Sequence, residues 1–268
     1  MPDNRTMLTA ENYYSPEANG QYWSASQVKA FNKCEARAMA ELQGHYRPDP
    51  SSALMIGSYV DEALTGDLDS WKGQHPEIFK RDGTLKADFA QAEQMVARAL
   101  QSDLFMDYLD GQHQVIVTGK LFGEYLFKAK LDAYHPGKAI VDLKTVRSLE
   151  SVYLPGAGRV DFATAWDWPL QMAIYQALTE QKTGVRLPCY LAVITKENPP
   201  DLELVEIEQE RLDAEMVWLA QKMPRFDAIK KGIIEPERCG RCPWCRATHY
   251  IDGPKMLGEF EMFGGTEE

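Results

Sequence analysis

Two short segments with alternating apolar residues, joined by a turn sequence, constrain the fold of this chain more than any other feature. In residues 124–134 and 139–145 the apolar residues fall mainly on odd-numbered positions, which is the period of a β-strand with one buried face. Between them, the sequence HPGK is a turn signal. The pattern predicts a β-hairpin whose odd-numbered face packs on the core and whose even-numbered face lies off it.

The even-numbered face of this predicted hairpin carries Asp132, Asp142 and Lys144. Asp132 lies beside Asp142 only if the numbers of paired residues sum to 274, which makes residues 136–138 a three-residue loop. A two-residue loop would pair Asp132 with Val141 and place the two carboxylates on opposite faces. Neighbouring carboxylates repel each other unless a cation lies between them, and oxygen ligands in an open site suit Mg²⁺ or Mn²⁺.

A lysine next to such a metal site is typical of enzymes that hydrolyse phosphodiester bonds. Lys144 follows Asp142 by two residues on the same face, so it can hold a phosphate oxygen or orient an attacking water. Two carboxylates, a metal and a lysine together suit phosphodiester hydrolysis. An Asp-x-Lys triplet alone is frequent by chance and is more often part of a solvated face, so the assignment depends on the surrounding sequence.

That surrounding sequence, KAKLDAYHPGKAIVDLKT, resembles the core of the PD-(D/E)XK nucleases, in the branch with RecB-like and RecE-like enzymes. In that family an Asp ends one strand and a D-x-K lies on the next. The resemblance implies an α/β (α+β) fold with a restriction-endonuclease-like core, in which helices flank a mixed central sheet. It also implies that Asp132, Asp142 and the backbone carbonyl of Leu143 hold the metal, and that Lys144 is catalytic.

Two further segments match the same branch. GSYVDEAL looks like the helix that supplies an upstream metal ligand, with Asp61 where many relatives have His. The adjacent Glu62 is the alternative ligand, but it would point about 100° away on a helix. QMAIY resembles the Gln-x-x-x-Tyr helix of this branch, which implies that Gln171 and Tyr175 contact the lysine or the DNA backbone. Residues four apart share one face of a helix, so both could do so.

The five cysteines fall into two groups. Cys189 lies in the apolar segment CYLAVIT and is expected to be an inert core residue. Cys239, Cys242 and Cys245 have the C-x2-C-x2-C spacing of bacterial ferredoxins, which requires a fourth, remote ligand. Cys34 is the candidate, because RecB-like nucleases with a 4Fe–4S cluster have one early cysteine and three near the C-terminus.

Two alternatives for the cysteines stay open. Zn²⁺ could bind the three C-terminal thiolates together with His249, four residues after Cys245. The thiols could also be reduced and free of metal, which is the least favoured interpretation because three lie within seven residues. Either metal would tie distant parts of the chain together.

Helical periodicity dominates the rest of the chain, and the 268 residues are expected to form a single nuclease domain. Its predicted parts are N-terminal helices in 23–110, a catalytic core in 111–232 and a cysteine segment in 233–268. We predict an arm over 1–22, a loop over 146–163, helices over 24–42, 53–64, 86–109, 165–182 and 208–231, and strands over 189–195 and 202–207.

Composition limits the class of protein. An apolar fraction of 44% and a charged fraction of 26% are typical of globular proteins, and no apolar run approaches the ~18 residues of a membrane span. The N-terminus lacks the layout of a signal peptide, so we expect a protein of the bacterial or phage-infected cytoplasm. A net charge of −11 argues against a globally basic surface, but not against a local basic groove around an acidic metal site.

These features give a hypothesis about function: a DNA exonuclease that requires Mg²⁺ or Mn²⁺ and carries a 4Fe–4S cluster or, alternatively, Zn²⁺. Resemblance to RecE-like phage and prophage enzymes implies 5′ to 3′ digestion of duplex ends, with a single-strand annealing protein as partner and a homo-oligomer as a further expectation. One alternative is a nuclease for single strands, as in CRISPR-adaptation or helicase-associated nucleases. Another is a non-catalytic, iron–sulfur-stabilised module that binds DNA or protein, against which the intact Asp132, Asp142 and Lys144 argue.

Overall fold

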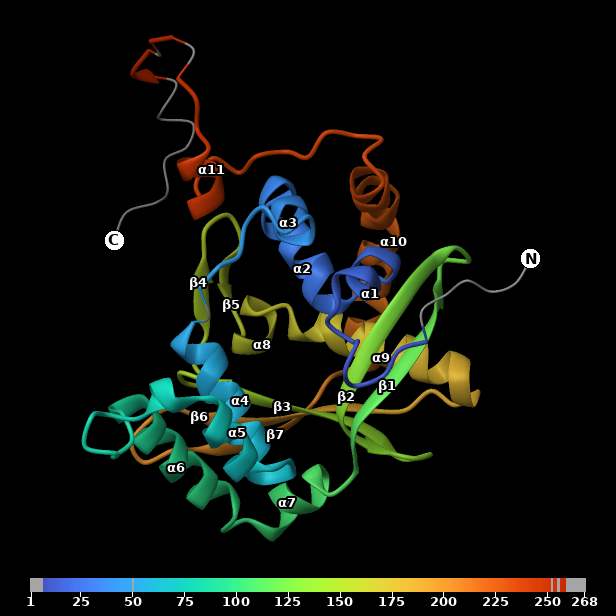
Figure 1. Cartoon of the computed structure of the whole chain (residues 1–268). Coiled ribbons are helices and arrows are strands. Elements are labelled where there is room, and N and C mark those ends of the chain that lie inside the picture. The colour runs from blue at the N-terminus through green and yellow to red at the C-terminus, as the bar shows by residue number, and fades with distance from the viewer. Residues whose placement is uncertain (1–6, 50, 252, 255, 259–268) are drawn as a thin grey trace.

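The computed structural model describes residues 7–49, 51–251, 253–254 and 256–258, and its N-terminal part is helical (Figure 1). Helices precede the sheet in the order α1 (Pro16–Gln21), α2 (Ala25–Lys33), α3 (Glu35–Leu42), α4 (Ser52–Thr65), α5 (Leu68–Gln74), the 3-10 turn η1 (Pro76–Ile78), α6 (Ala87–Ala99) and α7 (Asp103–Leu109). None of the helices in these described ranges has the length and hydropathy needed to cross a membrane.

Two predicted helices are each divided in two, and the predicted N-terminal arm contains α1. The helix predicted over 24–42 breaks at Cys34, whose φ of −169° and ψ of 106° are extended. The helix predicted over 86–109 is interrupted before Ser102, whose side chain accepts the N–H of Phe105 and so begins α7. Hydrophobic periodicity runs through both breaks, which is why it did not reveal them.

Five strands form a mixed sheet, as predicted. The strands are β1 (Gln112–Leu121), β2 (Tyr125–His135), β3 (Ala139–Val146), β6 (Cys189–Thr195) and β7 (Leu202–Glu206), in the order β1-β2-β3-β6-β7. β3 and β6 are parallel, and the other neighbours are antiparallel. The segment predicted as a loop over 146–163 contains a second, two-stranded sheet of β4 (Val152–Leu154) and β5 (Gly158–Val160).

The register of the β2–β3 hairpin agrees with the three-residue loop. Ala133 pairs with Val141 and His135 pairs with Ala139, so that 136–138 form the connection. Gly137 has a φ of 71°, a left-handed conformation that glycine adopts without a steric penalty. The pairing ends at Ala133 and Val141, one position before Asp132 and Asp142, and the Asp132 carboxylate there accepts the backbone N–H of Leu143.

A parallel pair needs a crossover connection, and helices provide it between β3 and β6. After the small hairpin come α8 (Phe162–Ala165) and α9 (Trp168–Thr183), and after β7 come α10 (Gln209–Lys230) and α11 (Pro243–Ala247). α9 ends at Gly184, which has a φ of 74° and donates its N–H to the carbonyl of Glu180. The crossover places α9 against the sheet, where it can present side chains to β3.

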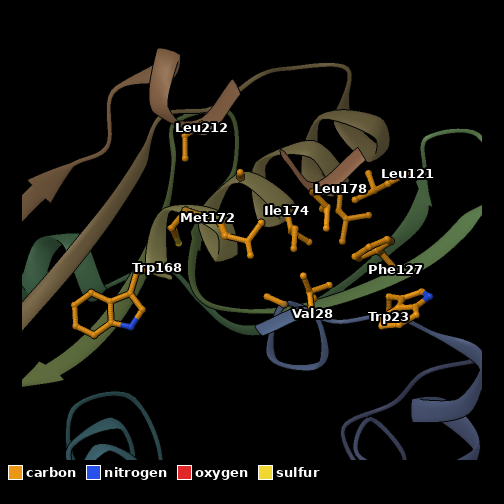
Figure 2. Close-up of a cluster of buried hydrophobic side chains, with 14 of the residues drawn as sticks. Trp23, Val28, Leu121, Phe127, Trp168, Met172, Ile174, Leu178 and Leu212 are labelled. Carbon is orange, nitrogen blue, oxygen red and sulfur yellow. The ribbon is translucent and has the colours of Figure 1, made fainter. Parts of the chain in front are cut away.

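Both faces of the sheet are covered by helices (Figure 1). On one face, α2, α3, α9 and α10 enclose a core with residues of β2, β3 and β6. Figure 2 shows part of it, with Ile174 and Leu178 of α9 near Phe127 of β2. On the other face, α4, α6 and α7 enclose a second core that includes Val141 and Leu143 of β3.

This arrangement corrects one expectation about β3. The even-numbered face was predicted to lie off the core, yet Ile140 is fully buried and Asp142 is only 1% exposed. The reason is that α9 and α2 cover this face and present polar side chains to it. Asp142 therefore lies in the interior of the protein, where its charge must be compensated.

Candidate active site and cysteine cluster

Three carboxylates from different elements lie close together, two of them in the wall of a cleft and the third buried behind it. Asp132 comes from the end of β2, Asp142 from β3 and Asp61 from α4. The backbone N–H of Leu143 donates to Oδ2 of Asp132 over 3.1 Å, and Nε2 of Gln114 donates to Oδ2 of Asp61 over 3.3 Å. Asp61, Asp132 and Leu143 line the cleft, which has a volume of about 1130 Å³.

The carboxylates disfavour each other's ionisation. Burial raises the pKa of Asp132 well above its ordinary value, and the nearby charges of Asp142 and Asp61 raise it further. Burial likewise raises the pKa of Asp61. The site thus concentrates oxygen ligands whose negative charge lacks full compensation within the protein.

Lys144 supplies the positive charge closest to these carboxylates. Its ammonium group forms an ion pair with Oδ2 of Asp142, and it lies 5.9 Å from the centre of the Trp168 ring. Burial opposes the charged form, but the charges of Asp142 and Asp132 outweigh it, so the pKa of Lys144 is raised. Lys144 is therefore a cation near neutral pH and lines the cleft.

Gln171 links Asp142 to two other side chains. Its Nε2 donates to Oδ1 of Asp142 over 2.9 Å and to Oη of Tyr175 over 3.0 Å. Its Oε1 accepts from Nζ of Lys29 over 3.0 Å. Gln171 and Tyr175 lie one turn apart on α9, as the sequence spacing predicted for a shared helix face.

Lys29 is the polar residue of this network that sequence reasoning missed. It comes from α2, and burial together with the nearby charge of Lys144 lowers its pKa to about 7. Its contact with Gln171 joins positions 142 residues apart. Helical periodicity around Lys29 carries no signal of that contact.

Asp61 and Glu62 point in different directions, as expected for adjacent residues on a helix. Asp61 lines the cleft, and its side chain also accepts from Oγ1 of Thr65 over 3.1 Å. Glu62 instead accepts the backbone N–H of Asp67 over 3.1 Å. Of the two candidates for an upstream ligand, only Asp61 faces Asp132 and Asp142 across the cleft.

A divalent cation fits this donor set chemically. Mg²⁺ and Mn²⁺ bind oxygen ligands, and a cation here would offset the repulsion that raises the pKa of Asp132. The three carboxylates do not form a tight group of metal ligands. Within the described ranges, only the four cysteines described below have potential ligand atoms that all lie within 4.8 Å of one another. An open site of this kind leaves room for a substrate.

The cleft combines basic and aromatic side chains, although the whole chain carries a net charge of −11. Its basic residues are Lys128, Lys130, Lys144, Arg147 and Lys196, and its aromatic residues are Tyr13, Tyr14, Trp166, Trp168 and Tyr175. Tyr14 is 67% exposed and Trp166 is 50% exposed, so both rings are accessible. A local basic groove beside an acidic centre, which the net charge did not exclude, can attract a polyanion despite the overall charge.

The second cluster consists of Cys34, Cys239, Cys242 and Cys245, whose sulfur atoms all lie within 4.8 Å of one another. Sγ of Cys34 lies 3.6 Å from Sγ of Cys245 and 3.8 Å from Sγ of Cys242. The backbone N–H groups of Cys242 and Cys245 each donate to the sulfur three residues earlier, over 3.3 Å and 3.4 Å. Four thiols in this arrangement suit either a tetrahedral metal or an iron–sulfur cluster.

Electrostatics around the thiols favour a ligand role for Cys239. Burial opposes its ionisation, but the backbone N–H groups of Cys242 and Arg241 outweigh it and lower the pKa of Cys239 to about 6. Burial raises the pKa of Cys34, which a bound cation would offset. Metal binding and thiolate formation are thus linked at this cluster.

An ion-pair network holds the two halves of the cluster together. Glu35, next to Cys34, accepts from Nε and Nη2 of Arg225 over 2.7 Å and 2.8 Å, and from the backbone N–H of Glu237 over 2.7 Å. The N–H of Ala36 donates to the carbonyl of Glu237 over 3.0 Å. These contacts place the start of α3 beside the segment that leads to Cys239.

Cys189 and His249 both lie apart from this cluster, Cys189 in the core as predicted. Cys189 is buried in β6, and its thiol donates to the carbonyl of Met172 over 3.7 Å. His249 is exposed and is not part of the four-residue group, so the alternative in which it completes a zinc site with the three C-terminal cysteines is wrong for this geometry. Cys34 occupies the fourth position because α3 packs beside the C-terminal loop.

Comparisons with known proteins show the family to which the chain belongs. Residues 24–248 match the family described as a PDDEXK-like domain of unknown function (DUF3799). A crystal structure from Eubacterium rectale, described as a "putative exonuclease", is 39% identical, has a TM-score of 0.92 and covers 98% of this chain and 100% of its own. Another structure, of SSO0001, is 16% identical over 81% of this chain and 96% of its own, but its TM-score of 0.29 supports no argument. No curated protein matches.

Proposed function

We propose that this chain, which belongs to the family of PDDEXK-like domains, is a nuclease and, more specifically, a metal-dependent exonuclease of DNA. The observation that carries the proposal is the close approach of Asp132, Asp142 and Lys144 where β2 and β3 diverge, beside a cleft lined with basic side chains. We further propose that it digests duplex ends from the 5′ side in phage or prophage recombination. A single-strand annealing protein and a second copy of the chain are the partners that this role would require.

In the proposed reaction, water attacks a backbone phosphate and the bond to one ester oxygen breaks. Asp61, Asp132 and Asp142, with the carbonyl of Leu143, would hold Mg²⁺ or Mn²⁺, which would supply Lewis-acid stabilisation of the phosphate and lower the pKa of the attacking water. The Lys144 ammonium would orient that water and stabilise the negative charge that grows on the phosphate oxygens.

Gln171 and Tyr175 have supporting roles in this proposal. Gln171 fixes the orientation of the Asp142 carboxylate through its 2.9 Å hydrogen bond. Tyr175 lines the cleft beside it, where its hydroxyl can contact the strand. Burial and the charge of Asp142 raise the pKa of Tyr175 well above its ordinary value, so it would act as a neutral hydrogen-bonding group.

End-labelled DNA tests the proposal directly. Wild-type protein with Mg²⁺ should shorten a 5′-labelled duplex and release the label first, whereas a 3′-labelled duplex should keep its label until digestion is nearly complete. Lys144→Met should reduce the rate by about a thousandfold or more, because the developing charge loses its cation. The matched control is Lys138→Met, since Lys138 is exposed in the hairpin loop away from the cleft. Equal rates for the two variants would contradict the assignment of Lys144.

The accessible aromatic rings favour a second candidate, a nuclease that acts on single strands. Tyr14 and Trp166 line the same cleft as Lys130 and Arg147. Basic grooves with exposed aromatic rings bind unpaired strands, because each base can stack on a ring. Faster digestion of a single strand than of the matching duplex, with Trp166→Ala slowing only the former, would favour this candidate.

For the cysteine cluster, we propose a 4Fe–4S centre bound by Cys34, Cys239, Cys242 and Cys245, with one Zn²⁺ as the alternative. The C-x2-C-x2-C spacing and the N–H donors directed at sulfur support the iron–sulfur assignment. Anaerobically purified protein should be brown, with about four irons and four sulfides per chain. Colourless protein with one zinc per chain would establish the alternative.

A further inference from the structure

We propose that Lys29 is a positioning residue for the proposed nuclease reaction, because its ammonium group fixes the orientation of the Gln171 amide that contacts Asp142. The inference rests on the proposed function. Its basis is a chain of two hydrogen bonds, 3.0 Å from Lys29 Nζ to Gln171 Oε1 and 2.9 Å from Gln171 Nε2 to Asp142 Oδ1.

The glutamine amide has an oxygen that accepts hydrogen bonds and an NH₂ group that donates them, and Lys29 contacts the oxygen. The Lys29 amine donates to Oε1 of Gln171, so the oxygen end of the amide faces Lys29. This orientation directs the NH₂ group toward Asp142 Oδ1 and Tyr175 Oη, which accept its protons. If the amide turned by half a rotation, its oxygen would face the Asp142 carboxylate and repel it.

The orientation of Asp142 depends on this contact. Asp142 is 1% exposed, so water cannot replace a lost hydrogen bond without rearrangement of the site. Its Oδ2 forms the ion pair with Lys144, and its Oδ1 accepts from Gln171. Lys29 therefore acts on the proposed metal ligand and on Lys144 through Gln171.

Among the described residues, the Lys29 side chain donates one hydrogen bond, and the carboxylates of Asp142, Asp167 and Glu215 act on its charge from beyond ion-pair distance. The Lys29 side chain is not among those that line the cleft. Lys29 is half-buried, and its hydrogen bond goes to a neutral amide and not to a carboxylate, so the orientation of Gln171 explains this contact better than an ion pair does.

A set of five variants tests this role by single-turnover cleavage of end-labelled DNA with enzyme in excess. The variants are Lys29→Met, Lys29→Arg, Gln171→Met, the double variant of Lys29→Met with Gln171→Met, and Lys33→Met. Methionine keeps the length of the side chain and removes a buried charge, so the fold should persist. Lys33 is exposed one turn further along α2 and serves as the control.

Lys29→Met should lower the single-turnover rate by about 10- to 100-fold, the effect expected for a lost hydrogen bond to a charged group. DNA affinity measured without divalent metal should stay within about twofold of wild type, because Lys29 does not line the cleft. Lys29→Arg should recover much of the rate, since it keeps a charged donor. In the Gln171→Met background, Lys29→Met should cause no further loss, because Lys29 acts through Gln171.

Equal rates for Lys29→Met and Lys33→Met would overturn the inference, as would an undiminished effect of Lys29→Met in the Gln171→Met background. A wild-type protein that cuts no DNA would refute the proposed function instead. In that case a crystal structure of Lys29→Met decides the inference on its own. A turned or displaced Gln171 amide would support it, and an unchanged hydrogen bond to Asp142 would overturn it.

Discussion

If the cysteine cluster holds a metal as proposed, replacing Cys34 with serine should destabilise the protein far more than replacing Cys189, the other cysteine outside the C-terminal loop. Cys34 is the one ligand of the four-cysteine cluster that comes from the N-terminal helices, and it lies 211 residues before Cys245. A metal that keeps the three C-terminal ligands could stay bound, but it would no longer connect the N-terminal helices to the C-terminal loop. Serine tolerates the extended backbone at position 34, so the change acts mainly on the thiol.

The size of this effect follows from the length of the closed loop. For a cross-link that closes 211 residues, the chain-entropy relation gives a stabilisation of about 5 kcal/mol at 25 °C. A domain of ordinary stability unfolds with about 5–15 kcal/mol, so the loss would be a large fraction of the total. With a urea m-value of about 3 kcal/mol/M, the midpoint should fall by about 2 M.

Urea unfolding followed by circular dichroism measures this shift, with metal content determined on the same samples. Cys189→Ala is the matched control, because Cys189 is buried but lies outside the cluster, and it should cost only about 1 kcal/mol for lost packing. His249→Ala should change neither metal content nor stability. If Cys34→Ser kept both its metal and a free energy of unfolding within about 1 kcal/mol of wild type, the closure argument would be refuted.

Three further predictions test other parts of the structure. Asp142→Asn should lower Mg²⁺-dependent DNA cleavage about a thousandfold, whereas Glu62→Gln, which alters a carboxylate turned toward the Asp67 backbone, should cleave at nearly the wild-type rate. Burial lowers the pKa of Lys128 from 10.5 to about 8. Below pH 8 the folded protein must hold the buried charge, which lowers its stability. Between about pH 8 and 10.5 the folded protein loses this charge before the unfolded chain does, so the free energy of unfolding should rise. Urea unfolding of Lys128→Met over this range should lack that rise, and an unchanged pH dependence would exclude the buried charge as its cause. Gly111→Ala should destabilise by about 1–3 kcal/mol in thermal unfolding, because a Cβ would lie 3.0 Å from the carbonyl oxygen of Tyr134, while Gly73→Ala, with nothing within 4 Å, should not.

The sequence contained enough information for the mixed sheet, and it limited the register of its hairpin to two alternatives, of which the structure has the three-residue loop. Strand periodicity and the HPGK turn are local signals, and a glycine at 137 fits the left-handed position that a three-residue loop requires. The predicted strand at Cys189–Thr195 has the same bounds in the structure. By contrast, the β4–β5 hairpin has only three residues in each strand, too few for alternation to distinguish it from a loop.

The cysteine cluster shows what spacing alone can and cannot predict. Three thiols within seven residues indicate a metal site because one loop can bring them together without help from the rest of the fold. The choice between Cys34 and His249 as the fourth ligand depends on where α3 packs. That packing is set by Arg225 and Glu237, which bind Glu35 from positions about 200 residues away. No local pattern encodes such contacts.

The face of β3 that carries Asp142 and Lys144 shows why the burial of Asp142 and the contact of Lys29 could not be predicted. On a strand pattern, Asp142 and Lys144 indicate a solvated face, because charged residues avoid interiors. The structure buries Asp142 and leaves Lys144 half-buried, because a polar layer covers that face, in which Gln171 of α9 binds Asp142 and Lys29 of α2 binds Gln171. Each of these side chains, taken alone in its helix, has an ordinary polar position. The network forms because α2 and α9 both pack on β3, which brings Lys29 to Gln171 and Gln171 to the buried Asp142. A contact that depends on the packing of three separate elements leaves no pattern within any one of them.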